Sequence, residues 1–266
     1  MVTEKTLVVS FLLSAWLLAA CVQGQPTPEA NVPPAEEAAS RTITVALAQA
    51  PETLDPADHR DRTTETVIRN IFDGLVTRDT RNGVHLELAE EMVWLDDQTL
   101  EVKLRQGVLF HDGVEMTADD VVFTFERIIQ ENAIEYPEPH SSPRRSLIAP
   151  LESIEKTDAY TVRMRFSAPW PSAMQLLVHQ QILPKHSVEE VGTEGFIKRP
   201  IGTGPFMFRE WVKDDHVAVV ANPDYFEGQP NADFWYYKVV ENTTVQFAQL
   251  QTGELDYACL NDMEGL

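Results

Sequence analysis

The sequence predicts a mixed α/β (α+β) fold, and the segment 92–130 contains the two patterns that indicate it. Apolar residues in 100–104 alternate with charged ones, which is typical of a strand with one buried face. Thr117 stands three residues before Asp120, the spacing of a capping box, and apolar residues then recur at helical spacing. The segment therefore predicts a strand, a turn, a second strand at 108–110, another turn and a helix.

Elements nearer the start of the chain are predicted from the same periodicities. Residues 42–47 alternate between apolar and polar side chains and predict the first strand. The prolines of 51–56 then fix an extended loop that a helix cannot occupy. Thr64 can cap a helix whose apolar side chains share one face, and Gly74 is placed to end that helix.

Later in the chain we expect a strand, a short helix, an extended return, a hairpin, a strand and a final helix. These occupy residues 160–166, 171–178, 180–184, 206–219, 234–240 and 243–253, respectively. The hairpin turns at 213–215, and Gly253 closes the last helix, as glycine often does. Alternating strands and helices of this kind support the α/β assignment.

Length and charge limit the class of protein. With 266 residues and 43% hydrophobic content, the chain can bury one or two substantial cores. Its formal net charge of −21 argues against a nucleic-acid partner, because contacts to phosphate need clustered lysine and arginine. The same charge says little about a small ligand, since most of it is expected on the solvated surface.

The N-terminal segment indicates export and lipid attachment. Residues 7–20 are almost wholly apolar but too few for a comfortable membrane span, and small residues precede Cys21. This pattern looks like a lipobox, so we predict a signal peptide at 1–20 and lipidation of Cys21. A signal-anchor helix that stays in place is the alternative. Residues 21–40, rich in Pro, Ala and Glu, predict a disordered tether.

The two cysteines agree with that assignment. If Cys21 carries lipid, Cys259 is the single thiol of the folded body and no internal disulfide forms. Cys259 lies in an apolar run, so we expect a small core residue rather than a nucleophile.

Several longer motifs follow one another in a fixed order. They are TLDP at 53–56, IFDGL at 71–75, the strand–turn–helix pattern of 99–121 with LRQGVLFHDG at its centre, PIGTGPF at 200–206, NPDYF at 222–226 and GELD at 253–256. In this order the motifs resemble those of the bacterial extracellular solute-binding proteins, family 5. These are the receptors of oligopeptide, dipeptide and nickel ABC importers.

The resemblance implies a periplasmic-binding-protein-like (type II) fold with an inserted extra domain. Residues 41–76 and 191–266 would form lobe I, and residues 77–190 the inserted small domain of the peptide-binder type. Family members continue into a second large lobe, so we expect this chain to be the first half of a two-lobed receptor, as a fragment or a truncated gene product.

The resemblance also implies where a ligand binds. The residues expected to line the cleft are Arg60, Asp61, Arg62, Thr63, Tyr136, Gln180, Gln181 and Thr203. The stretch 60–63 corresponds to backbone that pairs with an extended peptide in oligopeptide receptors. Expected partners are a peptide or other small solute, an ABC transporter permease, and the membrane through the lipid anchor. The expected location is the cell envelope, on the outer face of the cytoplasmic membrane or in the periplasm or outer membrane. No cofactor and no chemistry on the ligand are expected.

Alternatives remain at this point. Within the same family, the ligand could be nickel or another small solute. A protein of another class, a cell-surface metallohydrolase or an adhesion module, would need a different site. His111-Asp112 could suggest a metal ligand or catalytic pair, but no second histidine at metal spacing and no nucleophile motif accompany it. A hydrogen-bonded turn is the better interpretation. His179, His186 and His216 are dispersed, and we expect each at the surface or with a hydrogen-bond partner.

Overall fold

The strands of residues 40–259, the part of the chain that the computed structural model describes, form two four-stranded sheets and two small ribbons. The predicted leader, Cys21 and the tether before residue 40 lie outside the described residues. Within the described part, no helix combines the length and apolar character needed to cross a bilayer.

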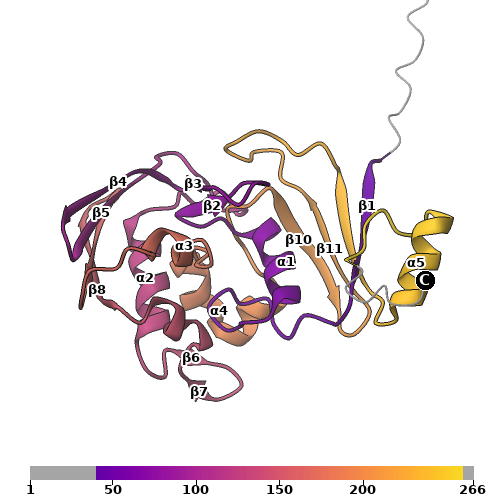
Figure 1. The fold of residues 1–266 in the computed structure, drawn as a ribbon, viewed down its shortest axis with the longest axis horizontal. Helices are drawn as coiled ribbons and strands as arrows, with labels where there is room; N and C mark the ends of the chain where they lie inside the picture. Colours follow the sequence, from indigo (N-terminus) through magenta and orange to yellow (C-terminus); the bar gives the residue numbers. More distant parts are fainter. Residues whose placement is uncertain (1–39, 260–266) are drawn as a thin grey trace, which may run out of the picture. The chain divides into compact units, whose positions relative to one another are not determined.

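The first sheet joins the start of the described chain to its last third (Figure 1). Its order is β1 (Thr42–Leu47), β12 (Phe234–Val239), β11 (His216–Ala221) and β10 (Phe206–Val212). Strand β1 is parallel to β12, and the other pairs are antiparallel. These are the predicted first strand, hairpin and late strand, so those predictions are confirmed.

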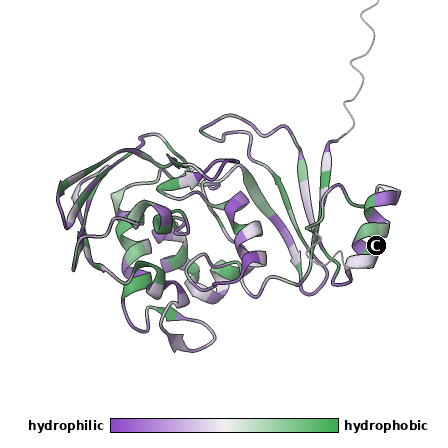
Figure 2. Ribbon diagram, viewed as in Figure 1, coloured by the Kyte–Doolittle hydropathy of each residue, from purple (hydrophilic) through white to green (hydrophobic). Residues whose placement is uncertain are grey.

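The second sheet is antiparallel throughout and comes from the middle of the chain. Its order is β4 (Ala89–Asp96), β5 (Thr99–Leu104), β9 (Thr161–Phe166) and β8 (Leu151–Asp158). Strands β5 and β9 were predicted from alternation, and their alternate side chains are buried. Figure 2 shows the resulting mixture of hydrophobic and hydrophilic residues on the strands. The predicted strand at 108–110 is wrong, because only Leu109 makes an isolated bridge, to Glu115.

The helices and minor strands connect these sheets. The helices are α1 (Arg62–Ile71), α2 (Ala118–Ile129), the 3₁₀ helix η1 (Pro143–Ile148), α3 (Ala173–Leu177), α4 (Lys185–Lys198) and α5 (Thr243–Thr252). The minor strands are β2 (Val76–Arg78), β3 (Val84–Leu86), β6 (Ile134–Glu135) and β7 (Pro139–His140). Helix α2 packs against β8 and β9, and α1 packs against β10 (Figure 1).

Local capping chemistry explains the helix ends. Thr117 and Asp120 form the predicted capping box, with Thr117 N donating to Asp120 Oδ2 at 2.9 Å. Gly253 closes α5 with φ of 75°, also as predicted. Helix α1 differs from the prediction. Asp61 rather than Thr64 is its N-cap, and the helix ends at an extended Phe72, before Gly74.

Two further expectations are corrected by the structure. Cys259 is exposed, so it is not a core residue. Helix α4 was not predicted, because Gly192 interrupts it with φ of 71° and its apolar residues do not follow a single face.

The chain crosses between elements at Gly202 and Gly204, which lie against the end of α1. A Cβ atom on Gly202 would be 1.9 Å from the carbonyl oxygen of Ile71, and one on Gly204 would be 2.6 Å from the carbonyl carbon of Ile71. Gly204 N donates to that same oxygen at 2.9 Å. Glycine is required at both positions because any side chain would collide with the helix backbone.

Candidate functional site

A cavity of about 440 Å³ lies where the first turns of α1 face η1 and the end of α3. Its wall includes Arg60, Asp61 and Arg62, three of the residues expected from the sequence to line a cleft. Thr63, the fourth residue of that stretch, is half-buried on α1 and lies outside the wall. The other wall residues are Glu65, Thr66, Arg69, Arg144, Leu147, Leu176 and His179.

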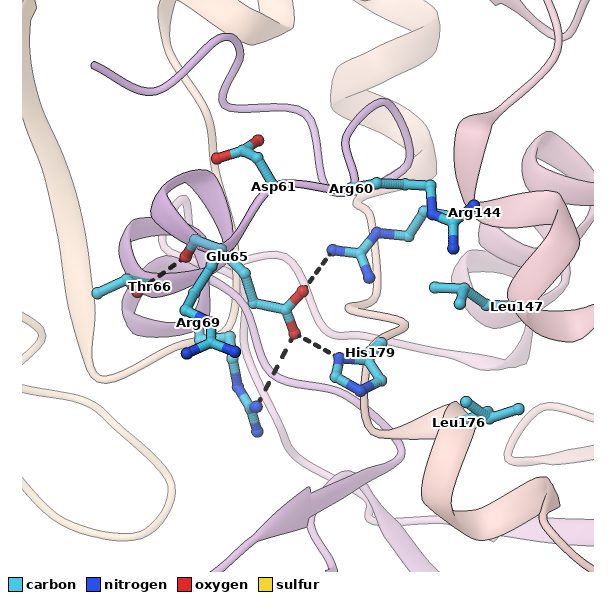
Figure 3. A pocket seen from close by; sticks show the side chains of 10 residues that line it. Arg60, Asp61, Glu65, Thr66, Arg69, Arg144, Leu147, Leu176 and His179 are labelled. Carbon is cyan, nitrogen blue, oxygen red and sulfur yellow. Dashed lines mark hydrogen bonds and ion pairs between the residues drawn. The ribbon is translucent and has the colours of Figure 1, made fainter. Parts of the chain in front are cut away.

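Glu65 is at the centre of the polar contacts of this cavity (Figure 3). Its carboxylate accepts a hydrogen bond from Arg144 Nη2 at 2.8 Å and lies 2.7 Å from His179 Nδ1. Arg69 Nη1 is 3.9 Å away. Burial acts to raise the pKa of Glu65, but the hydrogen bond with His179 and the charge of Arg144 outweigh it and lower the pKa to about 2. The carboxylate is therefore ionised at neutral pH.

Arg144 lines the cavity but is almost fully buried, with its side chain 1% exposed. Its guanidinium contacts the imidazole of His59 as well as Glu65. Burial, together with the charge of Arg144, lowers the pKa of His59 to about 4, so His59 is neutral at pH 7. Arg144 Nε is buried and has no hydrogen-bond partner among the described residues.

Arg60, in the loop before α1, and Arg62, the first residue of α1, both line the cavity. Arg60 and Arg62 are both exposed. Arg60 Nη1 donates to Ser146 Oγ at 3.0 Å, which joins this loop to η1. Between them, Asp61 Oδ1 accepts from Thr64 N at 2.6 Å and caps α1. The cap holds the loop in place because it satisfies a free amide of the helix start.

The other residues expected at a ligand site lie elsewhere. Tyr136 is half-buried in the turn between β6 and β7. Gln180 and Gln181 are buried, and their Nε2 atoms lie 3.4 Å from the carbonyl oxygens of Leu176 and Val178. None of these three side chains is part of the cavity wall.

Thr203 is also buried and takes part in a separate polar cluster. Its hydroxyl donates to Asp73 Oδ2 at 2.9 Å, and Tyr225 Oη lies 3.3 Å from Asp73 Oδ1. Burial, and then the nearby charge of Glu87, raise the pKa of Asp73 well above its usual range. In this structure Thr203 supports the crossing beside α1, and its role toward a ligand stays a prediction.

The histidines behave as expected from the sequence. His111 Nδ1 accepts from Gly202 N at 3.2 Å, and its Nε2 lies 2.9 Å from Gly204 O, so the imidazole binds the glycine crossing. The three dispersed histidines each have a carboxylate partner at 2.7 Å, and the pairs are His179–Glu65, His186–Asp112 and His216–Asp215. Within residues 40–259, no group of three or more His, Cys, Asp or Glu side chains is arranged to hold a metal ion.

Sequence patterns did not point to the residues that complete the cavity. Glu65 is separated from Arg144 by 79 residues and from His179 by 114, and no local spacing reports such pairs. The adjacent arginines Arg144 and Arg145, in a chain with twice as many acidic as basic residues, were the one available signal.

Known proteins are similar to this chain over most of its length. The model of the bacterial extracellular solute-binding proteins, family 5, middle part, matches residues 83–265. The oligopeptide-binding protein AppA of Bacillus subtilis is 36% identical over 201 residues, which cover 72% of this chain and 36% of AppA. The glutathione-binding protein GsiB of Shigella boydii is 30% identical over 225 residues, which cover 83% of this chain and 42% of GsiB.

Solved structures agree with the sequence matches. The structure of AppA in complex with a nonapeptide superposes with a TM-score of 0.74 at 31% identity, over 82% of this chain and 44% of AppA. NikZ of Campylobacter jejuni, in complex with Ni(L-His), gives a TM-score of 0.72 at 27% identity, over 82% of this chain and 43% of NikZ. AppA and GsiB are both named as binding proteins and not as enzymes.

The fold therefore defines a solute-binding protein of the periplasmic type II class, with mixed α/β architecture. More narrowly, the chain belongs to the bacterial extracellular solute-binding proteins, family 5. The matched region covers 36% of AppA and 42% of GsiB, so the chain spans less than half the length of the curated relatives it matches.

Proposed function

We propose that the chain is the ligand-capturing part of an ABC importer and that its ligands are peptides. The observation that carries this proposal is the cavity at the start of α1, whose wall contains residues 60–62. Its charged side chains suit the polar backbone and ends of a peptide, and Leu147 and Leu176 suit apolar side chains. The peptide named in the AppA structure and the family membership give further support.

The proposed domain organisation follows the two sheets. Residues 41–76 and 191–266 would form lobe I, which includes β1, β10, β11 and β12, and residues 77–190 the inserted small domain. The boundary at 190 falls close to Gly192, where the backbone of α4 leaves helical geometry. In a complete receptor, a second lobe would close over the ligand, and the closed form would bind the permease.

Ligand contacts beyond the cavity wall, by Thr63, Tyr136, Gln180, Gln181 and Thr203, belong to the same proposal. So does attachment to the outer side of a membrane through lipidated Cys21. The support for the anchor is the apolar run at 7–20, followed by small residues and a cysteine.

Peptide binding can be measured by calorimetry, with the purified chain titrated against a pool of tri- to pentapeptides. We expect saturable binding by the natural chain and at least about tenfold weaker binding by Leu147→Trp, because the larger ring would fill the cavity. Leu95→Trp is the matched control, since Leu95 is 50% exposed on β4 and away from the cavity.

Both variants must keep the circular dichroism spectrum and melting temperature of the natural chain for the comparison to count as a binding effect. Absence of saturable binding to any peptide would contradict the proposed function. Equal binding by the natural chain and Leu147→Trp would place the ligand site elsewhere.

A further inference from the structure

The cavity at the start of α1 has a positive charge surplus in a strongly acidic chain. The whole sequence carries 42 acidic and 21 basic residues. The cavity wall reverses this ratio, because it contains four arginines, listed here as Arg60, Arg62, Arg69 and Arg144, against the two carboxylates of Asp61 and Glu65. A local reversal of sign at a concave site concentrates a ligand of the opposite charge.

The surplus is not cancelled by ion pairs within the site. Glu65 is shared by Arg144, Arg69 and His179, so one carboxylate serves two arginines. Asp61 is used in capping α1. Within residues 40–259, neither Arg60 nor Arg62 has a carboxylate oxygen within 4.0 Å, and Arg60 bonds only to the neutral hydroxyl of Ser146.

The uncompensated arginines are also the accessible ones. Arg60 and Arg62 are exposed, whereas Arg144 is almost fully buried behind them. Figure 3 shows Arg60 and Arg144 on the same side of the cavity, with Glu65 between Arg144 and α1. Arg144 Nε remains buried and without a partner, so the base of the site retains an unsatisfied donor.

Part of the cavity wall is apolar. Leu147 of η1 and Leu176 of α3 are half-buried and line the cavity. A bare inorganic anion would leave these side chains without a partner. A ligand that joins a carboxylate to an aliphatic portion can contact both the arginines and the leucines.

We propose that this cavity selects carboxylate-bearing peptides, with Arg60 and Arg62 binding the carboxylate and the two leucines packing against the aliphatic part. This inference rests on the proposed peptide-binding function and specifies in addition that the ligand carries a negative charge at this cavity. Arginine suits this task because its planar guanidinium donates two parallel hydrogen bonds to a carboxylate. The carboxylate can be the peptide C-terminus or an acidic side chain, and the shared chemistry is the same.

Calorimetric titration of the full chain with four tripeptides separates these sources. Ala-Ala-Ala as the free acid is compared with its C-terminal amide, and the amides of Ala-Glu-Ala and Ala-Gln-Ala are compared with each other. We expect at least one carboxylate-bearing peptide to bind about tenfold or more tightly than its neutral counterpart. Raising the salt concentration should weaken the binding of that peptide more than the binding of its neutral counterpart, because the interaction between exposed charges is screened.

The double variant Arg60→Gln/Arg62→Gln should lose this preference while it still binds the neutral peptides. Arg81→Gln is the matched control, because the side chain of Arg81 is 91% exposed and lies outside the cavity. Equal affinity for acids and amides, or an equal loss for both in the double variant, would overturn the inference and leave peptide binding intact. Failure of every peptide to bind would overturn the proposed function and this inference with it.

Discussion

His59 and Arg144 occupy one buried site although both side chains are bases. The imidazole is 2% exposed and contacts the guanidinium, so protonation would place two positive charges side by side in a poorly solvated position. Arginine keeps its proton at any ordinary pH, and therefore His59 is the side chain that is neutral. The carboxylates of Glu65 and Asp61 act to raise the pKa of His59, but burial and the charge of Arg144 outweigh them.

This arrangement predicts an acid-sensitive stability. The pKa of His59 falls from 6.5 to about 4 on folding, so between these values the unfolded chain binds more protons than the folded one. The contribution of His59 is complete above pH 6.5 and is lost as the pH falls through 4, by roughly 3 kcal/mol in total. Urea unfolding measured at several pH values between 7.5 and 4 checks this.

The variant His59→Gln should show a shallower loss of unfolding free energy over that range, because glutamine does not titrate. His111, whose pKa is also lowered by burial, contributes in the same direction in both proteins. Glu65 affects stability in a lower pH range. Its contribution is complete above about pH 4.5 and is lost as the pH falls toward about 2. Identical profiles for the natural chain and His59→Gln would contradict the role of His59.

At the scale of elements, the glycine crossing is held by α1 on one side and by His111 on the other. Gly202 O accepts from His111 N at 2.9 Å, while Gly202 N donates to the imidazole. The carbonyl of Ile71 occupies the space that a side chain on Gly202 would need. The motifs at 71–75, 104–113 and 200–206, far apart in sequence, thus meet at one place.

Gly202→Ala should therefore destabilise the fold by about 3 kcal/mol or more, because the new methyl group meets rigid backbone rather than a movable side chain. Chemical unfolding followed by tryptophan fluorescence measures the change. Gly83→Ala is the matched control, since the atoms nearest to its Cβ would be those of the Asp79 side chain, at 3.1 Å and beyond, and it should cost less than about 1 kcal/mol. Similar losses in the two variants would show that the close approach to α1 is not the cause.

Elements determined by neighbouring residues could be predicted from the sequence, whereas those that depend on distant contacts could not. The capping box of α2 and the alternation in β5 are local patterns with one structural solution. Strands β4 and β8 are mostly exposed, so no apolar alternation marks them, and they exist because β5 and β9 offer their edges. At the cavity, the family resemblance pointed to 60–63, but Arg144 and His179, which bind Glu65, come from elements far along the chain.

At the scale of the whole described fold, one buried ion pair joins the region of the first sheet to that of the second. Asp55 follows β1 in the loop of the TLDP motif, and Arg127 lies on α2, which packs against β8 and β9. The two side chains are 0% and 3% exposed and form a two-point contact, with Nη1–Oδ1 at 3.0 Å and Nη2–Oδ2 at 2.7 Å. Thr193 of α4 accepts a further hydrogen bond from Arg127.

Removal of one partner should cost far more than the pair contributes as a unit, because the remaining charge stays buried and unpaired. We expect Asp55→Ala and Arg127→Met each to lower the free energy of unfolding by about 3–5 kcal/mol, and the double variant to lose much less than the sum. Glu194→Ala, which breaks an exposed pair with Lys198, should cost less than about 1 kcal/mol. Additive losses in the double variant would mean that Asp55 and Arg127 stabilise the fold independently, and the ion pair would then not be what holds the two sheet regions together.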